Sequence, residues 1–357
     1  MNSERRTDNI DYSSYRRQRN RRNRRIIMIR SIMLIAVLLA VLLLIIFVIV
    51  RINKSRITDY YDTEAGYARV LAMDRELDEL VPFAKDIAVV KPNYDNLPDV
   101  YTAQAGLLTE CSGVDVAYQK NALNKMHPAS TTKIMTAICA LKYGNLDDQI
   151  TITEDAMVTE EGASLSGIKP GQILNLKQLL YGLMLPSGND AANAIAIYIS
   201  GSIPEFVDLM NREAASIGAV DSHFTNPHGM TDDEHYTTAY DLYLIMNEAI
   251  KYPEFRTIGS TKTFIAEFMD NVTDERGNPL AISKTWESTN QYLTGEHELR
   301  SGLTLIGGKT GTTMKAGKCM VLALEDETGK EYVEVVLNSD SKKSLYDNLD
   351  ILSRCIE

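Results

Sequence analysis

The sequence has one tryptophan, four cysteines and no Cys-x-x-Cys pair among its 357 residues. Without that pair, a thioredoxin-like motif or a zinc ribbon has no support. Nor does any internal repeat or low-complexity tract appear between residue 100 and the C-terminus. The composition of 45% hydrophobic and 24% charged residues is ordinary for a globular protein. It excludes a mostly disordered chain and a polytopic membrane protein.

Lysine is missing from the first 30 residues, which contain ten arginines, three acidic residues and a net charge of +7. Because the whole chain carries −11, the remaining 327 residues carry −18. Charge, glycine and proline are all missing from residues 31–50, where only Ser31 is not apolar. As a helix, 20 such residues span about 30 Å, the thickness of a hydrocarbon core. We predict a transmembrane anchor at residues 31–50.

The charges beside this segment predict its orientation. A cleaved signal peptide is the alternative, but its apolar region is shorter and the basic segment Arg51–Arg56 is a poor cleavage context. The arginines of residues 16–25 outweigh those basic residues, so the positive-inside rule predicts a cytoplasmic arm at residues 1–30. We expect this arm to contact anionic lipid and not nucleic acid. The cell membrane, crossed once, is the predicted location, with all later residues extracytoplasmic.

The extracytoplasmic part divides into a predicted stalk, residues 51–99 with a helix near Tyr67–Val81, and a large domain, residues 100–357. Strand patterns lie at both ends of that domain: Tyr101–Leu108, Val114–Gln119, Leu305–Thr312, Cys319–Leu324 and Tyr332–Leu337. Helical patterns follow the first two strands or close the chain: Leu176–Met184, Asp190–Ser200, Pro204–Ile217, Ala239–Lys251 and a last helix with Leu345, Leu349, Leu352 and Ile356 on one face. We predict an α+β domain whose antiparallel sheet of terminal strands packs against a helical middle.

Serine becomes a good nucleophile beside a base, and a lysine three residues later on a helix lies one turn away. The chain contains three such pairs: Ser130/Lys133, Ser166/Lys169 and Ser339/Lys342. After Lys133 the sequence is apolar on every face of a helix, so that lysine is expected to be buried, where an unpaired charge is costly. The other two serines lie in turn-like or charged surroundings and are predicted to be surface residues.

Two further polar motifs interrupt apolar segments. Ser187-Gly-Asn189 follows a predicted helix, and alone it fits an interhelical turn equally well. Lys309-Thr310-Gly311 follows two more glycines, which permit close approach of a ligand to a strand, although a bulged strand is the alternative. Each motif is weak alone, but the order Ser-x-x-Lys, Ser-x-Asn, Lys-Thr-Gly with spacings of 57 and 122 residues is specific.

On these motifs the chain resembles the serine D-alanyl-D-alanine carboxypeptidases, the low-molecular-mass penicillin-binding proteins with a β-lactamase/transpeptidase-like fold. The resemblance runs from about Ala103 to the C-terminus and includes the segments 128–137, 185–192, 223–229 and 308–317. It implies a membrane-anchored enzyme that removes the terminal D-alanine from peptidoglycan stem peptides, that β-lactams inhibit covalently, and that needs no cofactor. Many relatives have a cleaved signal and are attached to the membrane by a C-terminal anchor. Attachment through residues 31–50 would place the anchor at the opposite end of the domain.

The resemblance also implies roles for individual residues. Ser130 would be acylated, Lys133 would accept its proton, and Ser187 would relay a proton to the leaving D-alanine. Asn189 would hold Lys133 and the substrate amide. The terminal carboxylate would meet Lys309 and Thr310 beside Gly311, and the backbone N–H groups of Ser130 and Thr312 would form the oxyanion hole.

Other interpretations stay open on the sequence alone. His223, His228 and His235 with Asp232 and Asp233 could hold zinc, but two of these histidines lie in the family-like segment, so no metal is expected. A β-lactamase would need a glutamate for its deacylating water, and Glu205, Glu213 and Glu234 are predicted to be solvated. A non-catalytic penicillin sensor would need more than 30 cytoplasmic residues. The pairing of Cys111, Cys139, Cys319 and Cys355, and the balance of hydrolysis and transpeptidation, stay open.

Overall fold

The computed structural model describes residues 28, 33, 87–90, 95–113, 116–273, 276–277 and 279–356. Apart from residues 28 and 33, the predicted arm and the predicted anchor lie outside these residues, as does the predicted helix near Tyr67–Val81. Within the part that is described, no helix has both the length and the apolar character needed to cross a membrane. The chain divides into two compact units, Met1–Val81 and Pro82–Glu357, and the five-stranded sheet and the helices packed on it belong to the second unit.

Strands from both ends of the domain form one antiparallel sheet of five strands in the order β2-β1-β9-β8-β7. The strands are β1 (Ala105–Glu110), β2 (Tyr118–Lys120), β7 (Leu303–Thr313), β8 (Gly317–Asp326) and β9 (Glu331–Ser339). Because β9 pairs with β1 along its length, the C-terminal hairpin closes the sheet on the first strand of the domain. The predicted sheet of terminal strands is confirmed.

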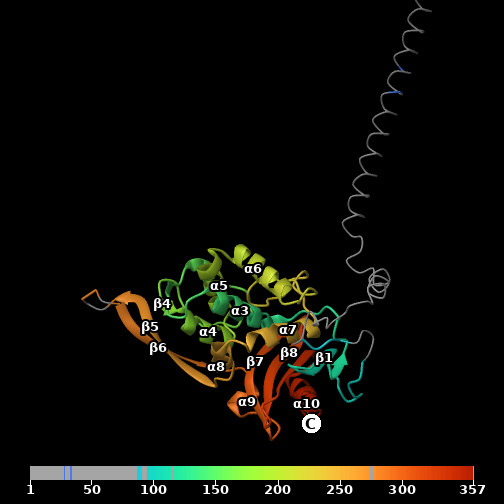
Figure 1. Ribbon diagram of the computed structural model, residues 1–357. Helices are drawn as coiled ribbons and strands as arrows, with labels where there is room; N and C mark the ends of the chain where they lie inside the picture. Colours follow the sequence, from blue (N-terminus) through green and yellow to red (C-terminus); the bar gives the residue numbers. More distant parts are fainter. Residues whose placement is uncertain are drawn as a thin grey trace, which may run out of the picture. The chain divides into compact units, whose positions relative to one another are not determined.

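Alternation along β9 gives the sheet two apolar faces. Val333, Val335 and Leu337 join the large core on the helical side. Tyr332 and Val336 belong to a smaller core that includes residues of α10 (Lys342–Ser353). Figure 1 shows α10 on the opposite side of this sheet from α3, α5 and α6. The sheet is therefore the middle one of three layers.

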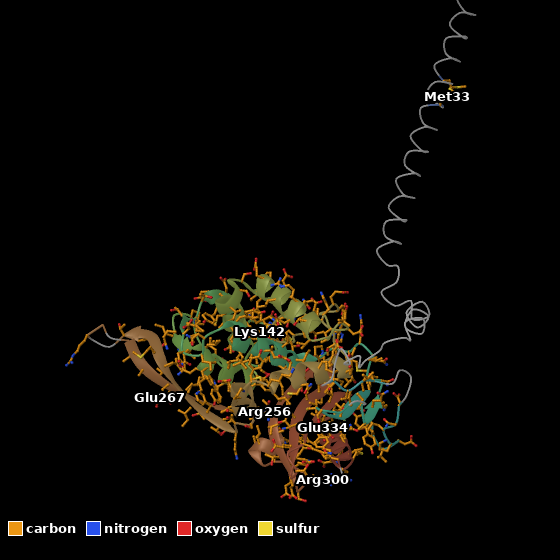
Figure 2. The ribbon with its side chains drawn as sticks, viewed as in Figure 1. Met33, Lys142, Arg256, Glu267, Arg300 and Glu334 are labelled. Atoms are coloured by element: carbon orange, nitrogen blue, oxygen red, sulfur yellow. The ribbon has the colours of Figure 1, made fainter. Side chains whose placement is uncertain are left out.

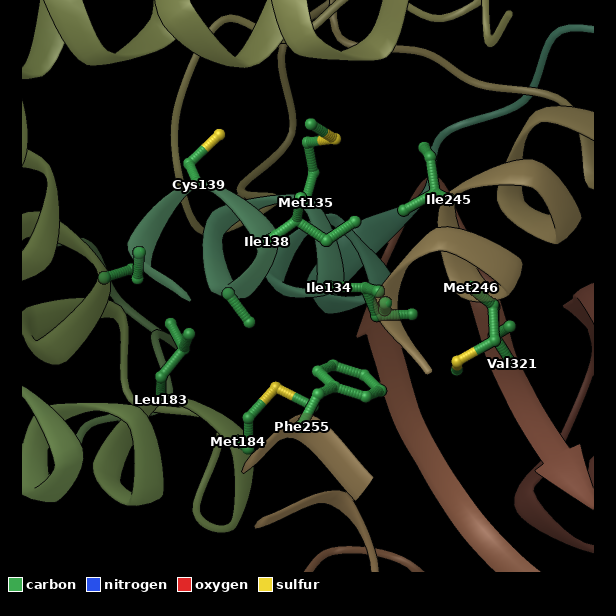
Figure 3. Packing of buried hydrophobic residues seen from close by; sticks show 14 of the residues in the cluster. Ile134, Met135, Ile138, Cys139, Leu183, Met184, Ile245, Met246, Phe255 and Val321 are labelled. Atoms are coloured by element: carbon green, nitrogen blue, oxygen red, sulfur yellow. The ribbon is translucent and has the colours of Figure 1, made fainter. Parts of the chain in front are cut away.

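The helical layer contains the predicted helices close to their predicted bounds. It consists of α3 (Lys133–Tyr143), α4 (Leu176–Met184), α5 (Asn189–Ser200), α6 (Ile203–Ser216), α7 (Ala239–Ala249) and α8 (Pro253–Gly259). Every residue of α3 from Lys133 to Ala140 is buried, as its apolar sequence predicts. Figure 3 shows side chains of α3 in the centre of the core, with those of α4, α7, α8 and β8 around them.

A second sheet of four strands lies within the segment that we expected to be helical. Its order is β3-β4-β5-β6, with β3 (Gln149–Thr151), β4 (Ile173–Asn175), β5 (Thr263–Thr273) and β6 (Pro279–Glu287). The β5–β6 hairpin extends to one side beyond the helices (Figure 1). In β5, Ala266 and Phe268 are buried while Ile265 is 60% exposed. Apolar residues on both faces hide the period of two, which explains why the strand pattern was missed.

Three polar residues that the sequence placed at the surface are buried: Ser339, Glu213 and Ser166, the last of which belongs to the site described below. Ser339 is 1% exposed, and its hydroxyl accepts a hydrogen bond from Asn348 of α10. Glu213 is 7% exposed, because it binds Lys142 at 2.6 Å and the hydroxyl of Tyr143. Glu205 and Glu234 are exposed, as predicted. Partners from other elements, α10 for Ser339 and α3 for Glu213, account for their burial, and local sequence does not show these contacts.

Glu334 on β9 is a fully buried carboxyl group, labelled in Figure 2. Its Oε1 accepts a hydrogen bond from Ser353 Oγ at 2.8 Å, while Oε2 has no hydrogen-bond partner among the described residues. Burial raises the pKa of Glu334 to about 8, because the charged form would lose its hydration.

We expect Glu334→Gln to gain stability relative to the parent protein as pH rises from about 4.5 to about 8. In this range the folded parent keeps a proton that the unfolded chain releases, so the parent's free energy of unfolding falls with pH and then levels off. Chemical denaturation at several pH values measures the difference, with the exposed Glu327→Gln as control. A difference that stays constant between pH 5 and 8 would contradict a protonated Glu334.

Candidate active site

The serine of the first motif precedes α3 on a short 3₁₀ turn, Ala129–Thr132. Lys133 begins α3, so its side chain reaches back over one turn, and Nζ lies 2.9 Å from Ser130 Oγ. The turn is enclosed on two sides by glycines. A Cβ on Gly229 would lie 1.8 Å from the carbonyl oxygen of Ala129, and one on Gly311 would lie 2.9 Å from that of Pro128. Only glycine permits these approaches, so the turn has little freedom to move.

The amine of Lys133 has three polar neighbours and no contact with water. Besides Ser130 Oγ, its Nζ donates to Asn189 Oδ1 and to the carbonyl oxygen of His228, both at 2.8 Å. These two oxygens can only accept hydrogen bonds. A neutral amine has two N–H groups and one lone pair, so with both N–H groups engaged its lone pair is left for the hydroxyl of Ser130.

Burial favours this neutral form, because the ammonium would lose its hydration. Lys133 is 0% exposed, and burial lowers its pKa well below the ordinary value, with a further decrease from the positive charge of Lys309. The carboxylate of Asp190 acts in the opposite direction but is the smallest of the three influences. The arrangement is that of a serine nucleophile with a lysine base.

The second motif brings Ser187 and Asn189 to the same place. Asn189 is the first residue of α5, which orients its amide toward Lys133. Ser187 has a φ of +63°, a left-handed conformation that non-glycine residues adopt rarely. Its hydroxyl is buried and has no hydrogen-bond partner among the described residues. Backbone strain and an unpartnered hydroxyl both concentrate at functional sites.

The third motif lies on β7, an edge strand of the five-stranded sheet. Lys309 is 1% exposed, its Nζ donates to the carbonyl oxygen of Thr310 at 2.9 Å, and burial lowers its pKa to about 7. The hydroxyls of Thr310 and Thr289 lie 2.5 Å apart. A Cβ on Gly311 would also lie 3.1 Å from the backbone nitrogen of Ser130, so β7 passes directly beside the nucleophile.

A pocket of about 200 Å³ connects the three motifs. The predicted residues that line it are Ser130, Ser187, Thr310, Gly311 and Thr312, and the others are Ser164, Thr289, Lys318, Lys342, Leu345 and Tyr346. Lys133, Asn189 and Lys309 are buried next to these lining residues. The structure therefore brings together all eight predicted site residues. No carboxylate lines this pocket, so its charge favours an anionic ligand.

Sequence reasoning missed the support that Asp190 gives to one wall. Asp190 is 2% exposed and accepts hydrogen bonds from the N–H groups of Ser166 and Gly167 and from the hydroxyl of Ser166. Ser166 was predicted to lie at the surface but is 2% exposed, while its partner Lys169 is exposed. The sequence signal was an acidic residue in the first turn of α5, but nothing local indicated what it binds.

The histidines considered for zinc serve other contacts. His228 Nδ1 accepts from the N–H of Met230, His235 Nδ1 accepts from that of Thr225, and His223 Nδ1 lies 2.6 Å from the carbonyl oxygen of Glu234. Among the described residues, no three His, Cys, Asp or Glu side chains are placed to hold a metal. All four cysteines lie in the described part of the chain, and each is a free thiol.

Comparison with known proteins agrees with this geometry. The family described as D-alanyl-D-alanine carboxypeptidase matches residues 93–341. D-alanyl-D-alanine carboxypeptidase DacF of Bacillus subtilis is 35% identical over 176 residues, which are 48% of this chain and 45% of that protein. A D-alanyl-D-alanine carboxypeptidase of Streptomyces sp. (strain K15) is 36% identical over 234 residues, which are 63% of this chain and 76% of that protein. The chain thus spans less than half of the first relative.

Among solved structures, the Streptomyces K15 DD-transpeptidase has a TM-score of 0.65 and 32% sequence identity. The similarity covers 72% of this chain and 98% of that chain. The predicted β-lactamase/transpeptidase-like fold is therefore confirmed for the domain.

The two buried lysines predict how the reactivity of Ser130 depends on pH. As pH rises, deprotonation of Lys133 should increase the rate constant for acylation by a β-lactam. Burial lowers the pKa of Lys309 to about 7, so above that pH Lys309 should lose its charge and initial binding of the anionic β-lactam should weaken. Lys309→Met should move the rising limb to higher pH, because a positive charge that lowers the pKa of Lys133 is removed. Stopped-flow measurement of acylation from pH 5 to 10 gives the rate constant and the initial binding. If the rising part of the rate profile stays at the same pH in Lys309→Met, the charge of Lys309 does not lower the pKa of Lys133.

Proposed function

The chain belongs to the serine D-alanyl-D-alanine carboxypeptidase family, and on this premise we propose that it removes the terminal D-alanine from peptidoglycan stem peptides through an acyl-enzyme on Ser130. The observation that carries the proposal is the buried Lys133 amine, bound to Asn189 and His228 and facing Ser130 Oγ at 2.9 Å. No other serine that the sequence singled out has a buried lysine partner.

In the first step, Ser130 Oγ attacks the carbonyl carbon of the penultimate D-alanine while Lys133 Nζ takes the hydroxyl proton. Negative charge then develops on the carbonyl oxygen, for which the backbone N–H groups of Ser130 and Thr312 serve as donors. When the C–N bond breaks, the leaving amine needs a proton. The free hydroxyl of Ser187 passes one to it and is replenished from Lys133.

In the second step, a water molecule attacks the ester carbonyl while Lys133 Nζ accepts a proton from it. When the ester bond to Ser130 breaks, Lys133 returns this proton to Ser130 Oγ, which completes hydrolysis. An amine in place of water would give transpeptidation, so one acyl-enzyme serves both outcomes.

The charge around the pocket supports a substrate with a free C-terminal carboxylate. The Nζ of Lys309 donates to the carbonyl oxygen of Thr310 at 2.9 Å, and Lys318 and Lys342 line the same pocket. The Thr310 hydroxyl, which lies on the pocket wall, is a donor for the carboxylate oxygens. A β-lactam carries a carboxylate and a reactive carbonyl, so it would acylate Ser130 in the same position.

The positions of the glutamates argue against rapid hydrolysis of that adduct. Glu205 and Glu234 are exposed, Glu213 is bound to Lys142, and none of them lines the pocket. The β-lactamase alternative lacks its deacylating carboxylate here. The sensor alternative differs in releasing no D-alanine, so turnover decides between it and the enzyme.

We expect the full-length protein in detergent to release D-alanine from a peptide ending in D-Ala-D-Ala and to hold a β-lactam adduct for a long time. Ser130→Ala should lose both activities, whereas Ser112→Ala, which removes an exposed hydroxyl, should keep them. A D-alanine assay, with and without an acceptor amine, and intact-protein mass spectrometry give the answers. Rapid loss of the adduct without D-alanine release would refute the carboxypeptidase, and labelling of Ser130→Ala would refute the nucleophile.

We also propose that residues 31–50 anchor the protein in the cell membrane, with residues 1–30 in the cytoplasm and the domain outside. The support is the uncharged apolar run and the net charge of +7 before it. Protease added to spheroplasts should digest the domain and spare an N-terminal tag, while permeabilised cells should lose both. Loss of the tag from intact spheroplasts would reverse the orientation, and full-length protein in the medium would refute the anchor.

A further inference from the structure

The residue before the nucleophile has an unusual backbone conformation. Ala129 has a φ of +50°, in the left-handed region that a residue with a Cβ rarely occupies. Such a conformation persists only where neighbouring groups hold it. Ala129 opens the turn that carries Ser130, so its conformation decides where Ser130 Oγ points.

A chain of two hydrogen bonds ends on the carbonyl oxygen of Ala129. The hydroxyl of Thr132 donates to this oxygen at 2.8 Å. Nε2 of His235, from a segment 103 residues further along the chain, lies 2.8 Å from the same hydroxyl. Because the Thr132 hydroxyl donates its only hydrogen to the Ala129 carbonyl, its oxygen can only accept a hydrogen bond from His235 Nε2.

The opposite edge of the His235 ring determines which nitrogen carries the hydrogen. Nδ1 accepts a hydrogen bond from the backbone N–H of Thr225 at 3.1 Å, so Nδ1 is unprotonated and Nε2 bears the hydrogen. The chain therefore runs in one direction, from the His235 N–H to the Thr132 hydroxyl to the Ala129 carbonyl. All three hydrogen bonds, from Thr225 to His235, from His235 to Thr132 and from Thr132 to Ala129, are consistent with a neutral imidazole.

Water has no access to compete for these groups. His235 and Thr132 are each 1% exposed, and burial lowers the pKa of His235 to about 3. The backbone of Gly229, with a φ of +88°, lies directly against the Ala129 carbonyl, because a Cβ on Gly229 would lie 1.8 Å from its oxygen. If the Thr132 hydroxyl were removed, this carbonyl would lose its side-chain donor.

We propose that His235 and Thr132 are positioning residues, which hold Ala129 in its left-handed conformation and so aim Ser130 Oγ at Lys133. The inference rests on the proposed function, because it concerns acylation of Ser130. Neither residue lines the pocket, so both act through the turn and not on the substrate. The sequence made His235 a candidate zinc ligand, and its contacts with Thr132 and Thr225 explain its burial in a different way.

The test separates binding from acylation in the full-length protein in detergent, with a chromogenic β-lactam as probe. Thr132→Val, which keeps the shape but removes the hydroxyl, and His235→Leu should lower the acylation rate constant by about 10- to 100-fold. Initial binding of the probe should stay within about threefold, because the pocket lining is unchanged. The double variant should react no more slowly than the slower single variant, since both interrupt one chain of hydrogen bonds.

Conservative variants distinguish positioning from general stability. Thr132→Ser and His235→Gln keep donors and acceptors in place and should retain the parent rate within about threefold. Ser222→Ala, which removes a partly buried hydroxyl bound to Asp241 away from the pocket, should lower the melting temperature without changing the rate constant. Parent-like acylation by a folded Thr132→Val protein would overturn the proposal.

One measurement needs no substitution. The ¹⁵N shifts of His235 in the parent protein should show a neutral ring protonated at Nε2, and protonation at Nδ1 would overturn the proposed chain even if the variants failed to fold. A parent protein that no β-lactam acylates would instead refute the proposed function. The histidine spectrum would then still decide whether the hydrogen bonds exist.

Discussion

The arrangement of the site depends on one buried amine. Lys133 has no contact with water, so its hydrogen bonds must come from the protein. Asn189 supplies one acceptor from 56 residues away, and the carbonyl oxygen of His228 supplies the other from 95 residues away. Because both acceptors are fixed on other elements, the lysine cannot turn from Ser130 without losing a bond. The cost of an unsatisfied buried amine thereby orients Lys133 toward Ser130.

Close packing of backbone fixes the rest of the site around that amine. Gly229 and Gly311 approach the turn of Ser130 from two sides, at distances where any side chain would clash. Gly311 belongs to β7, whose position is set by the five-stranded sheet, which in turn is closed by β9 on β1. The distance between Ser130 and Thr312 is therefore a property of the whole sheet. A motif as short as Lys-Thr-Gly lies beside Ser130 because strands from both ends of the domain hold it there.

The buried charged groups near the pocket differ in their contacts and in their protonation. Two buried lysines lie close enough for Lys309 to lower the pKa of Lys133, which favours a neutral base beside a cation that attracts carboxylates. The carboxylate of Asp190 is next to Asn189 in sequence, yet its oxygens are occupied by the backbone and hydroxyl of the Ser166 segment. It supports the wall and leaves the pocket without an acidic group. This distribution of charge is consistent with the acyl-enzyme that we propose.

Local sequence determined the features that depend on near neighbours. The period of apolar residues predicted α4 with its observed bounds, and the apolar run after Lys133 predicted the burial of α3. The three motifs, together with Thr312 directly after the third, contain all eight candidate site residues that the structure brings together in or beside the pocket. Tertiary structure decided the rest, because a polar residue is buried or exposed according to partners far away in the chain. Ser166 is buried by Asp190 and Glu213 by Lys142, 24 and 71 residues away, and no local pattern records such pairings.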